Sequence, residues 1–591
     1  MSDKNRLQLL GCIKAIADFI VDNAGIIFFY ILILAIAPFF MVNEMGEVRP
    51  LFSALPHIFS NAFFPASLFA GIRFLFLLSS KRFKFFRLLA GGVTFFVILI
   101  SFSDIWMRLN INTRWSDRIL RLIFETNNSE ASEFLSDNLF TSGSLTTFIL
   151  FFAVTALAYR FFVKSKVFID IFKGLTRNAT GTISLLLLFM TWNIWSVRVT
   201  AVEDCLEVMD SSSQLYSSVK AFKDQFKRVS IMEDAITKSD GRLNSSSDHP
   251  ARIVWVIGES ESKFHSQLYG YTKPTTPEMI KEVEKGNIII YNDVVSCVPN
   301  TANMMEILFS PADPLAPEEE RFSTPLFPMI LRKAGYNVRL FDNQQTLTVK
   351  GDKWYELGNC SFINSRKLSE ASFSYRNDSI FAYDNDFITY ILPKFQKKNY
   401  PVVDIIHLMG QHASASWRVP DEKRYKYFKS ADYSDRKDLN EEERQIVADY
   451  DNATRFVDSQ LARLIKEVED EDAILVYISD HGELMCDVDS RHWRASRPAT
   501  EISTAPFMYC VPFVVYTTPK FRETHPALYK RLQQGKDLPF SLAFFSHFMF
   551  DLAGVQSRFF NTSLSPLSPS WSYPSRPAVD IGDYDKWMNQ K

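Results

Sequence analysis

The sequence predicts a bundle of five membrane-spanning helices at the N-terminus, followed by an α/β domain outside the membrane. Three observations predict this architecture. Five apolar segments, each long enough to cross about 30 Å of hydrocarbon, lie within the first 200 residues. Lys and Arg are concentrated in alternate loops between these segments. Beyond residue 250, short apolar runs that stop at polar residues alternate with helical patterns.

Length and composition narrow the class of protein. A chain of 591 residues is too long for one ordinary domain. The 65 basic and 67 acidic residues give a net charge of -2 without a basic stripe, so we expect no nucleic-acid partner. The six cysteines include no CxxC pair, which argues against a zinc ribbon or a thioredoxin motif.

The predicted spans are 24–42, 59–79, 85–103, 144–163 and 179–196. One such segment alone could be a buried core helix, but five of them favour membrane helices. No small-residue cleavage pattern follows the first span, so we do not expect a cleaved signal peptide.

Charge predicts the orientation of the spans. Basic residues lie at the start of the chain, between spans two and three, and at 164–178, whereas the loop between spans one and two has only Arg49 beside two acids. The positive-inside rule therefore puts the N-terminus in the cytoplasm and everything after residue 197 outside.

These patterns divide the chain into a transmembrane domain at 1–197, a linker at 198–250 and a catalytic domain at 251–591. The outward loop 104–143 has helical apolar spacing, which predicts helices on the membrane surface. A plain amphipathic cover for the bundle is the alternative. The linker reads as an amphipathic helix followed by a stretch rich in Ser and Asp.

Four apolar, β-branched runs of the outer domain stop at polar residues. Buried strands that alternate with helices predict a parallel-type sheet, and the site of such a sheet lies at the carboxyl ends of its strands. The polar residues that end these runs are Glu259 and Ser260, Asp342 and Asn343, His407 and His412, and Asp480, His481 and Glu483.

The pair Asp480-His481 indicates a divalent metal, because an acid and an imidazole meet at the mouth of the sheet. Oxygen ligands with one imidazole suit zinc or manganese. His407 lies one position inside its apolar run, so we interpret it as a structural histidine.

A helix is predicted to begin near Asn300 or Thr301. A hydroxyl at a helix N-terminus faces the positive end of the dipole, which suits a phosphate and makes Thr301 a candidate nucleophile. The alternative, which this segment alone favours, is that Asn300 or Thr301 merely caps the helix.

The ordered motifs resemble one family, the phosphoethanolamine transferases of the alkaline phosphatase and sulfatase superfamily, which includes lipid A modifying enzymes. The motifs are GES at 258–260, Cys-x-x-x-Thr at 297–301, HLMGQH at 407–412, YDN at 450–452, SDHGE at 479–483 and His492. The resemblance covers nearly the whole chain. It implies a sulfatase-like α/β fold for the outer domain and a multi-pass protein of the bacterial inner membrane, with that domain in the periplasm.

The resemblance implies that Glu259, Thr301, Asp480 and His481 bind zinc and that Thr301 is the nucleophile. It places His412 and His492 around the phosphate or a second zinc, so one or two zinc ions are expected, and manganese less so. Further residues that match substrate-binding positions are Lys350 on the phosphate side and Thr126 and Glu130 near the donor headgroup.

The implied reaction transfers phosphoethanolamine from phosphatidylethanolamine to an envelope acceptor through a covalent phosphothreonine. Lipopolysaccharide is the first candidate acceptor, and periplasmic glucans or a protein stay open. This sequence departs from the family pattern at four points. It lacks closely spaced cysteine pairs, has Arg424 or a neighbour in place of a histidine, and has Leu122 in place of an asparagine. The segment after SDHGE, LMCDVDSRHWR, also differs from the best-known lipid A enzymes. These departures leave the acceptor undecided.

Other functions compete with this one. A phosphoglycerol transferase shares the fold and the Thr nucleophile, and a phosphodiesterase would use water as the acceptor. The Cys-x-Pro-x-Arg signature of sulfatases is absent, since Asn300 and Thr301 follow Cys297-Val298-Pro299. A degenerate scaffold is disfavoured because every ligand type is present, and a transporter because the spans carry no carboxylate.

Overall fold

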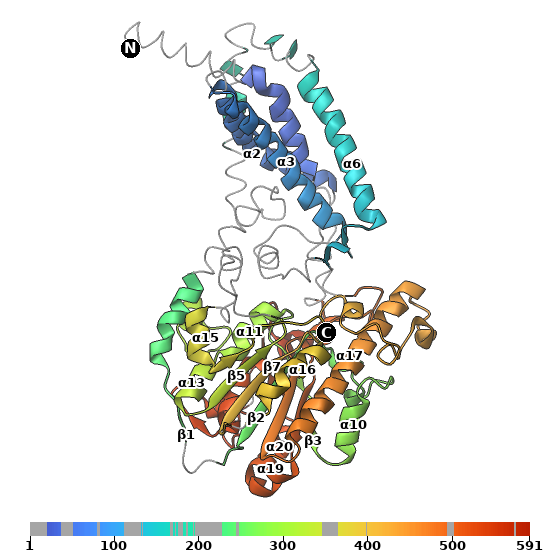
Figure 1. Ribbon diagram of the computed structural model, residues 1–591. Coiled ribbons are helices and arrows are strands. Elements are labelled where there is room, and N and C mark those ends of the chain that lie inside the picture. Colours follow the sequence, from blue (N-terminus) through green and yellow to red (C-terminus); the bar gives the residue numbers. More distant parts are fainter. Residues whose placement is uncertain are drawn as a thin grey trace. The chain divides into compact units, whose positions relative to one another are not determined.

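The computed structural model describes residues 20–36, 51–79, 83–110, parts of 132–194, and 227–590 apart from 244–247, 345–364, 398, 493–500 and 573–574. The chain forms two compact units, Met1–Lys223 and Asp224–Lys591 (Figure 1).

The described part of the N-terminal unit is helical. Its helices are Ile20–Ile36, α2 (Leu51–Ser79), α3 (Phe85–Asn110) and α6 (Ser142–Tyr159), which continues as a π-helical turn over Arg160–Lys164. Among the described residues, Phe85–Asn110 and Ser142–Lys164 are long and apolar enough to cross a membrane.

These two helices contain the spans predicted at 85–103 and 144–163. The spans predicted at 24–42 and 59–79 overlap the helix Ile20–Ile36 and α2, and much of 179–196 lies outside the described residues. The structure therefore supports a helical N-terminal unit with two candidate spans, and the count of five stays a prediction.

Small residues let the first helices of this unit pack closely. Ala62, Ala66 and Ala70 of α2 recur every four residues, so they lie on one face, and they are buried in the same cluster as Phe29 and Ile33. Both α3 and α6 also carry exposed large apolar side chains, such as Leu88 and Leu150, although Val97, Ile100 and Phe151 join the same buried cluster.

The catalytic unit is built on a seven-stranded sheet of order β3-β9-β8-β2-β7-β5-β6. Its strands are β2 (Arg252–Gly258), β3 (Ile288–Ile290), β5 (Asn337–Asp342), β6 (Tyr375–Arg376), β7 (Val402–His407), β8 (Ala473–Ser479) and β9 (Phe513–Thr517). The four runs predicted from the sequence are the central strands β8, β2, β7 and β5, and they are parallel. The sheet is mixed, because β9 is antiparallel to both β8 and β3.

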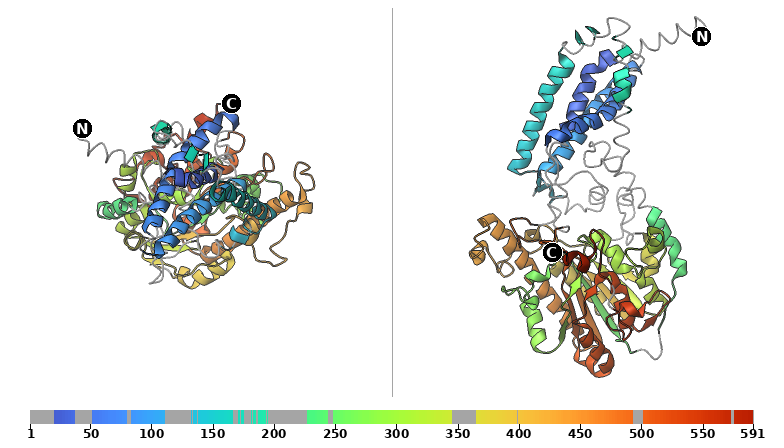
Figure 2. Two further views of the ribbon diagram at one scale, coloured as in Figure 1. Left: turned by 90° about the horizontal axis from the view of Figure 1, so that it is seen from above. Right: turned by 180° about the vertical axis from the view of Figure 1, so that it is seen from behind.

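Helices cover both faces of the sheet (Figures 1 and 2). Alternate residues of β2 point to opposite faces, as the two-residue period of a strand requires. Trp255 packs with residues of α11 (Thr301–Phe309), α13 (Phe327–Lys333) and α21 (Phe545–Leu552). Val254 and Val256 pack with α10 (Pro277–Glu284), α16 (Asp384–Phe395) and α17 (Glu441–Val468).

Smaller elements complete the catalytic unit. They are α12 (Glu318–Phe322), α15 (Arg366–Ser372), α18 (Ala505–Tyr509), α19 (Pro519–Thr524), α20 (Pro526–Gly535), α22 (Tyr584–Met588) and the pairs β4 (Val294–Val295) with β10 (Phe540–Ser541), and β12 (Pro577–Ala578) with β13 (Gly582–Asp583).

Residues 227–243, which fall within the predicted linker, also pack into the catalytic unit. Met232 is part of its core, and β1 (Arg242–Leu243) pairs with β11 (Val555–Gln556). The compact unit therefore extends N-terminal to residue 251.

Candidate active site

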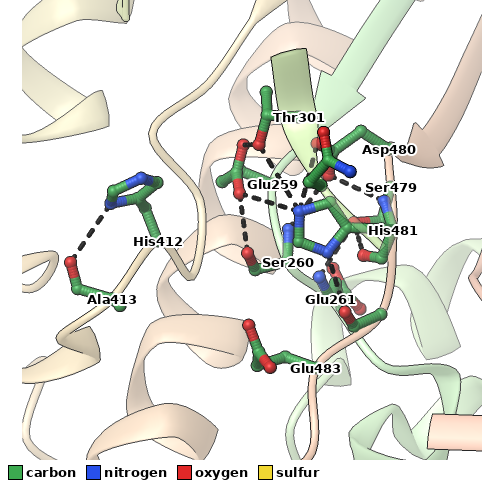
Figure 3. A network of polar contacts seen from close by, with 12 residues as sticks. Glu259, Ser260, Glu261, Thr301, His412, Ala413, Ser479, Asp480, His481 and Glu483 are labelled. Atoms are coloured by element: carbon green, nitrogen blue, oxygen red, sulfur yellow. Dashed lines mark hydrogen bonds and ion pairs between the residues drawn. The ribbon is translucent and has the colours of Figure 1, made fainter. Parts of the chain in front are cut away.

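The polar residues that follow β2 and β8 meet in one buried cluster at the carboxyl edge of the sheet. Glu259 follows β2, and Asp480 and His481 follow β8, its parallel neighbour. All three side chains are fully buried, and one potential ligand atom from each lies within 4.8 Å of the others. Figure 3 shows them converging beside Thr301.

Thr301 is the first residue of α11 rather than its cap. Asn300 is the cap, and its side chain accepts a hydrogen bond from the backbone N–H of Asn303 at 3.0 Å. The Thr301 hydroxyl is directed into the cluster, where Oγ1 donates to Glu259 Oε2 at 2.8 Å and lies 3.4 Å from His481 Nε2. Asn300 is therefore the cap, and the role of Thr301 as nucleophile stays a prediction.

Ser260 links the two carboxylates. Its backbone is left-handed (φ 58°), which turns its N–H toward Asp480 Oδ1 at 3.1 Å and its hydroxyl toward Glu259 Oε1 at 2.6 Å. The Tyr450 hydroxyl donates to the Ser260 carbonyl at 2.5 Å. A rare conformation held by three hydrogen bonds indicates a constrained site.

His481 turns Nε2 toward both carboxylates. Its Nδ1 lies 2.8 Å from the Gly482 carbonyl, an acceptor, so Nδ1 carries a hydrogen. Nε2 lies 3.4 Å from Glu259 Oε1 and 3.5 Å from Asp480 Oδ2. A neutral His481 would therefore offer the lone pair of Nε2 to a metal.

The electrostatics of the cluster favour a cation. Burial and the neighbouring Glu259 carboxylate raise the pKa of Asp480 to about 6. Asp480 Oδ2 is buried and has no hydrogen-bond partner. Two carboxylates, one imidazole nitrogen and one hydroxyl match the oxygen and nitrogen donors that zinc takes in fourfold coordination. These residues fit zinc.

His412 and His492 lie on separate loops. His412 follows β7, and its ring, drawn in Figure 3 beside the cluster, has Nδ1 3.1 Å from the Ala413 carbonyl. His492 forms a β-bridge with Met485, and its Nδ1 lies 3.1 Å from the Ser490 carbonyl. Their assignment to the phosphate stays a prediction.

Three predicted substrate residues lie outside the described residues. They are Thr126 and Glu130 of the outward loop and Lys350.

The structural interpretation of His407 agrees with its surroundings. The side chain is buried at the end of β7, and its Nδ1 lies 3.1 Å from Asp342 Oδ1 on β5. Burial alone lowers the pKa of His407, but the Asp342 carboxylate reverses this effect and raises it above the usual value.

Sequence reasoning missed two residues that support the cluster. Gln344 donates from Nε2 to Glu259 Oε2 at 3.0 Å. Asp384 accepts the N–H groups of Met409 and Gly410, both at 2.9 Å, and so holds the loop that carries His412. The signal for Gln344 was its place directly after the strand-ending pair Asp342-Asn343, whereas nothing in the sequence around Asp384 indicates its distant partners.

Comparison with known proteins agrees with this geometry. The sulfatase family model matches residues 251–555. The phosphoethanolamine transferase EptC of Escherichia coli K12 is 26% identical over 489 residues, which cover 78% of this chain and 79% of that protein. CptA, a phosphoethanolamine transferase of Salmonella typhimurium, is 26% identical over 479 residues, with the same coverage.

A solved structure extends the likeness to the fold. The integral membrane lipooligosaccharide phosphoethanolamine transferase A of Neisseria meningitidis has a TM-score of 0.61 at 17% identity, over 92% of this chain and 98% of that one. This chain therefore belongs to the sulfatase family, on the branch whose members are named phosphoethanolamine transferases.

Proposed function

We propose that this protein transfers phosphoethanolamine from phosphatidylethanolamine to an envelope acceptor, with lipopolysaccharide as the first candidate, through a phosphothreonine at Thr301. One observation carries the proposal: a threonine hydroxyl donates to a carboxylate inside a buried cluster suited to zinc. The relatives that match about four fifths of the chain are phosphoethanolamine transferases, which supports the nature of the transferred group.

The first displacement begins with the Thr301 hydroxyl. Its O–H donates to Glu259 Oε2, which leaves the lone pairs of Oγ1 available for attack on phosphorus. The new Oγ–P bond forms as the bond from phosphorus to the diacylglycerol oxygen breaks, and diacylglycerol leaves with a proton. Thr301 begins α11, whose N-terminal N–H groups and dipole favour a phosphate at this place.

The second displacement is the reverse reaction with another alcohol or phosphate oxygen. The acceptor oxygen attacks phosphorus, the bond to Thr301 Oγ breaks, and Thr301 regains a proton. Zinc at Glu259, Asp480, His481 and Thr301 would lower the pKa of the threonine hydroxyl and stabilise charge on the phosphoryl oxygens.

A lipid donor explains the apolar N-terminal unit. We place five helices across the bacterial inner membrane, with the N-terminus in the cytoplasm and the catalytic unit in the periplasm. Two helices long and apolar enough to span support this arrangement, together with the basic residues of alternate loops.

The remaining predicted residues would bind the phosphoethanolamine group. His412 and His492 would contact the phosphoryl oxygens, with Lys350 on the same side. Thr126 and Glu130, in the loop 104–143, would bind the donor headgroup, for which a carboxylate beside an ammonium is suitable chemistry.

The test is mass mapping of the Thr301 peptide. The purified full-length protein is incubated with zinc and phosphatidylethanolamine, without an acceptor, beside Thr301→Ala and the matched control Thr562→Ala. Thr562 is exposed and begins a short turn in another part of the catalytic unit. We expect a phosphoethanolamine adduct and released diacylglycerol in the wild type and the control, and neither in Thr301→Ala.

Two outcomes would contradict the proposal. An adduct of phosphoglycerol that appears only with phosphatidylglycerol would indicate a phosphoglycerol transferase. Release of free phosphoethanolamine without an adduct, at the same rate in Thr301→Ala, would indicate a phosphodiesterase that uses water.

A further inference from the structure

The end of β5 reaches the metal cluster through one amide side chain. Gln344 Nε2 lies 3.0 Å from Glu259 Oε2 and 2.9 Å from the Leu408 carbonyl. Both neighbours are acceptors only, so the two N–H groups of the amide face them and the orientation of the amide is determined. Gln344 therefore connects the ends of three parallel strands, β5, β2 and β7.

Gln344 donates to the same oxygen of Glu259 that accepts the hydrogen bond from the Thr301 hydroxyl. Oε2 accepts from both Thr301 and Gln344, whereas Oε1 accepts from the Ser260 hydroxyl. A glutamate carboxylate rotates easily about its last torsion angle, because that torsion has a broad energy profile. Hydrogen bonds to both oxygens restrict this rotation.

Gln344 is itself held by the framework. Its N–H donates to Asp342 Oδ1 at 2.9 Å. The preceding Asn343 donates from Nδ2 to Asp384 Oδ1 at 2.9 Å and from its N–H to the His407 carbonyl, also at 2.9 Å. The backbone on which the amide stands is thus tied to β7 and to the first turn of α16.

The backbone around Glu259 leaves little room for adjustment. A Cβ on Gly410 (φ 50°) would lie 2.8 Å from the Glu259 nitrogen, and the Gln411 N–H donates to the Glu259 carbonyl at 3.0 Å. The main chain of Glu259 is therefore fixed, and the rotation of its carboxylate is the freedom that Gln344 removes.

We propose that Gln344 is a positioning residue for Glu259: its amide fixes the carboxylate so that Oε2 is held toward the Thr301 hydroxyl and Oε1 toward His481 Nε2. When a residue that hydrogen-bonds to a metal ligand is mutated, metal affinity typically falls by a factor of about 10–100. The proposal rests on the metal centre of the proposed function but not on the identity of the donor lipid.

The test measures zinc affinity on the full-length protein by chelator competition, without lipid. Gln344→Met keeps the length of the side chain and removes the amide, and Gln344→Asn keeps the amide but shortens its reach by one methylene. Gln556→Met, on an exposed residue of β11, is the matched control. We expect both Gln344 variants to bind zinc about 10- to 100-fold more weakly, and the control to bind like the wild type.

A second readout separates positioning from loss of fold. The yield of the Thr301 adduct is titrated with zinc, and we expect the midpoint for Gln344→Met to rise while the yield at saturating zinc is largely restored. Wild-type zinc affinity in either Gln344 variant would overturn the proposal. An unchanged midpoint with a lower plateau would also overturn it. If the variants bind zinc weakly but the wild type forms no lipid adduct, the positioning role of Gln344 is supported and phosphatidylethanolamine is rejected as the donor.

Discussion

Two buried clusters of charged side chains lie at the two ends of the parallel strands, the amino edge and the carboxyl edge of the sheet, and they differ in how their charges are paired. At the amino edge, Asp404 of β7 lies between Arg252 of β2 and Arg339 of β5, at 2.8 and 2.6 Å. The two guanidinium groups also donate to the Phe395 carbonyl at the end of α16. At the carboxyl edge, Glu259 and Asp480 both lie close to His481 Nε2, at 3.4 and 3.5 Å.

The difference lies in charge compensation. Each oxygen of Asp404 accepts from an arginine, and Glu471 accepts from Arg252, so opposite charges meet. The carboxyl edge instead concentrates electron-rich groups and leaves Asp480 Oδ2 without a hydrogen bond. The amino-edge cluster pairs opposite charges, whereas we expect the carboxyl-edge cluster of the same sheet to be completed by a cation.

The largest effect on folding is expected from Asp404→Ala. This change leaves buried Arg339 without its carboxylate and Arg252 with Glu471 alone, and breaking a buried ion pair typically costs about 3–5 kcal/mol. Chemical denaturation of the full-length protein measures the free energy of unfolding, with the exposed Asp470→Ala as control. A change under about 1 kcal/mol would show that the amino-edge cluster contributes no more than a surface pair.

Near the carboxyl edge, His265 forms a cluster with two carboxylates in which opposite charges are paired. Its two nitrogens lie 2.7 Å from Asp451 Oδ1 and 3.1 Å from Asp487 Oδ1. Burial alone lowers the pKa of His265, but the two carboxylates outweigh it and raise the pKa to about 10. Because the folded pKa exceeds the unfolded value of about 6.5, this stabilisation is complete below pH 6.5 and is lost as the pH rises through 10.

We expect His265→Gln to be less stable than the wild type by several kcal/mol near pH 6, and this difference to shrink toward pH 10, since one pKa unit corresponds to about 1.4 kcal/mol. Denaturation at a series of pH values, with Thr562→Ala as reference, measures it. A difference that does not depend on pH would mean that His265 is not charged in the folded protein.

Asp480→Asn should separate folding from metal binding. The asparagine keeps an oxygen for the N–H groups of Ser260 and His481, which Asp480 Oδ1 accepts at 3.1 and 2.8 Å. It removes a charge that Glu259 repels. We expect the melting temperature of the metal-free protein to stay the same or rise slightly, and zinc affinity to fall more than 10-fold by chelator competition. A clear fall in that melting temperature would assign a structural role to Asp480.

The smallest effect is expected for an exposed ion pair. Lys281 Nζ lies 2.7 Å from Glu278 Oε1 on the surface of α10. Lys281→Ala should change the free energy of unfolding by about 0.5 kcal/mol or less, because water screens such pairs. A loss comparable to that of Asp404→Ala would remove the distinction between buried and exposed charges on which the comparison depends.

The sequence was sufficient to predict the central strands and the meeting of Glu259, Asp480 and His481, whose role as metal ligands stays a prediction. Apolar runs ending in Glu259, Asp480 and His481 are local patterns, and parallel strands bring their ends together. The antiparallel direction of β9 could not be predicted from its composition, because a buried run of Val and Tyr suits either direction. The predicted boundary at residue 251 also missed Met232, whose burial depends on distant residues.

The supporting residues were harder to predict than the ligands. Gln344 and Asp384 act through contacts with Glu259, Met409 and Gly410, which lie 25 or more positions away in the chain. Amides and carboxylates at such places have no sequence pattern of their own, since their role depends on tertiary distance. Ser260 was noted as a strand end, but its left-handed backbone appears only in the structure.

The central claim is that the uncompensated cluster at the carboxyl edge is the metal centre. X-ray absorption at the zinc edge, on the full-length protein loaded with one equivalent of zinc, tests it most directly. The account predicts oxygen ligands with a single imidazole nitrogen and no sulfur, and loss of this signal in Asp480→Asn. Sulfur ligands, or an unchanged spectrum in Asp480→Asn, would place the zinc elsewhere and contradict the account.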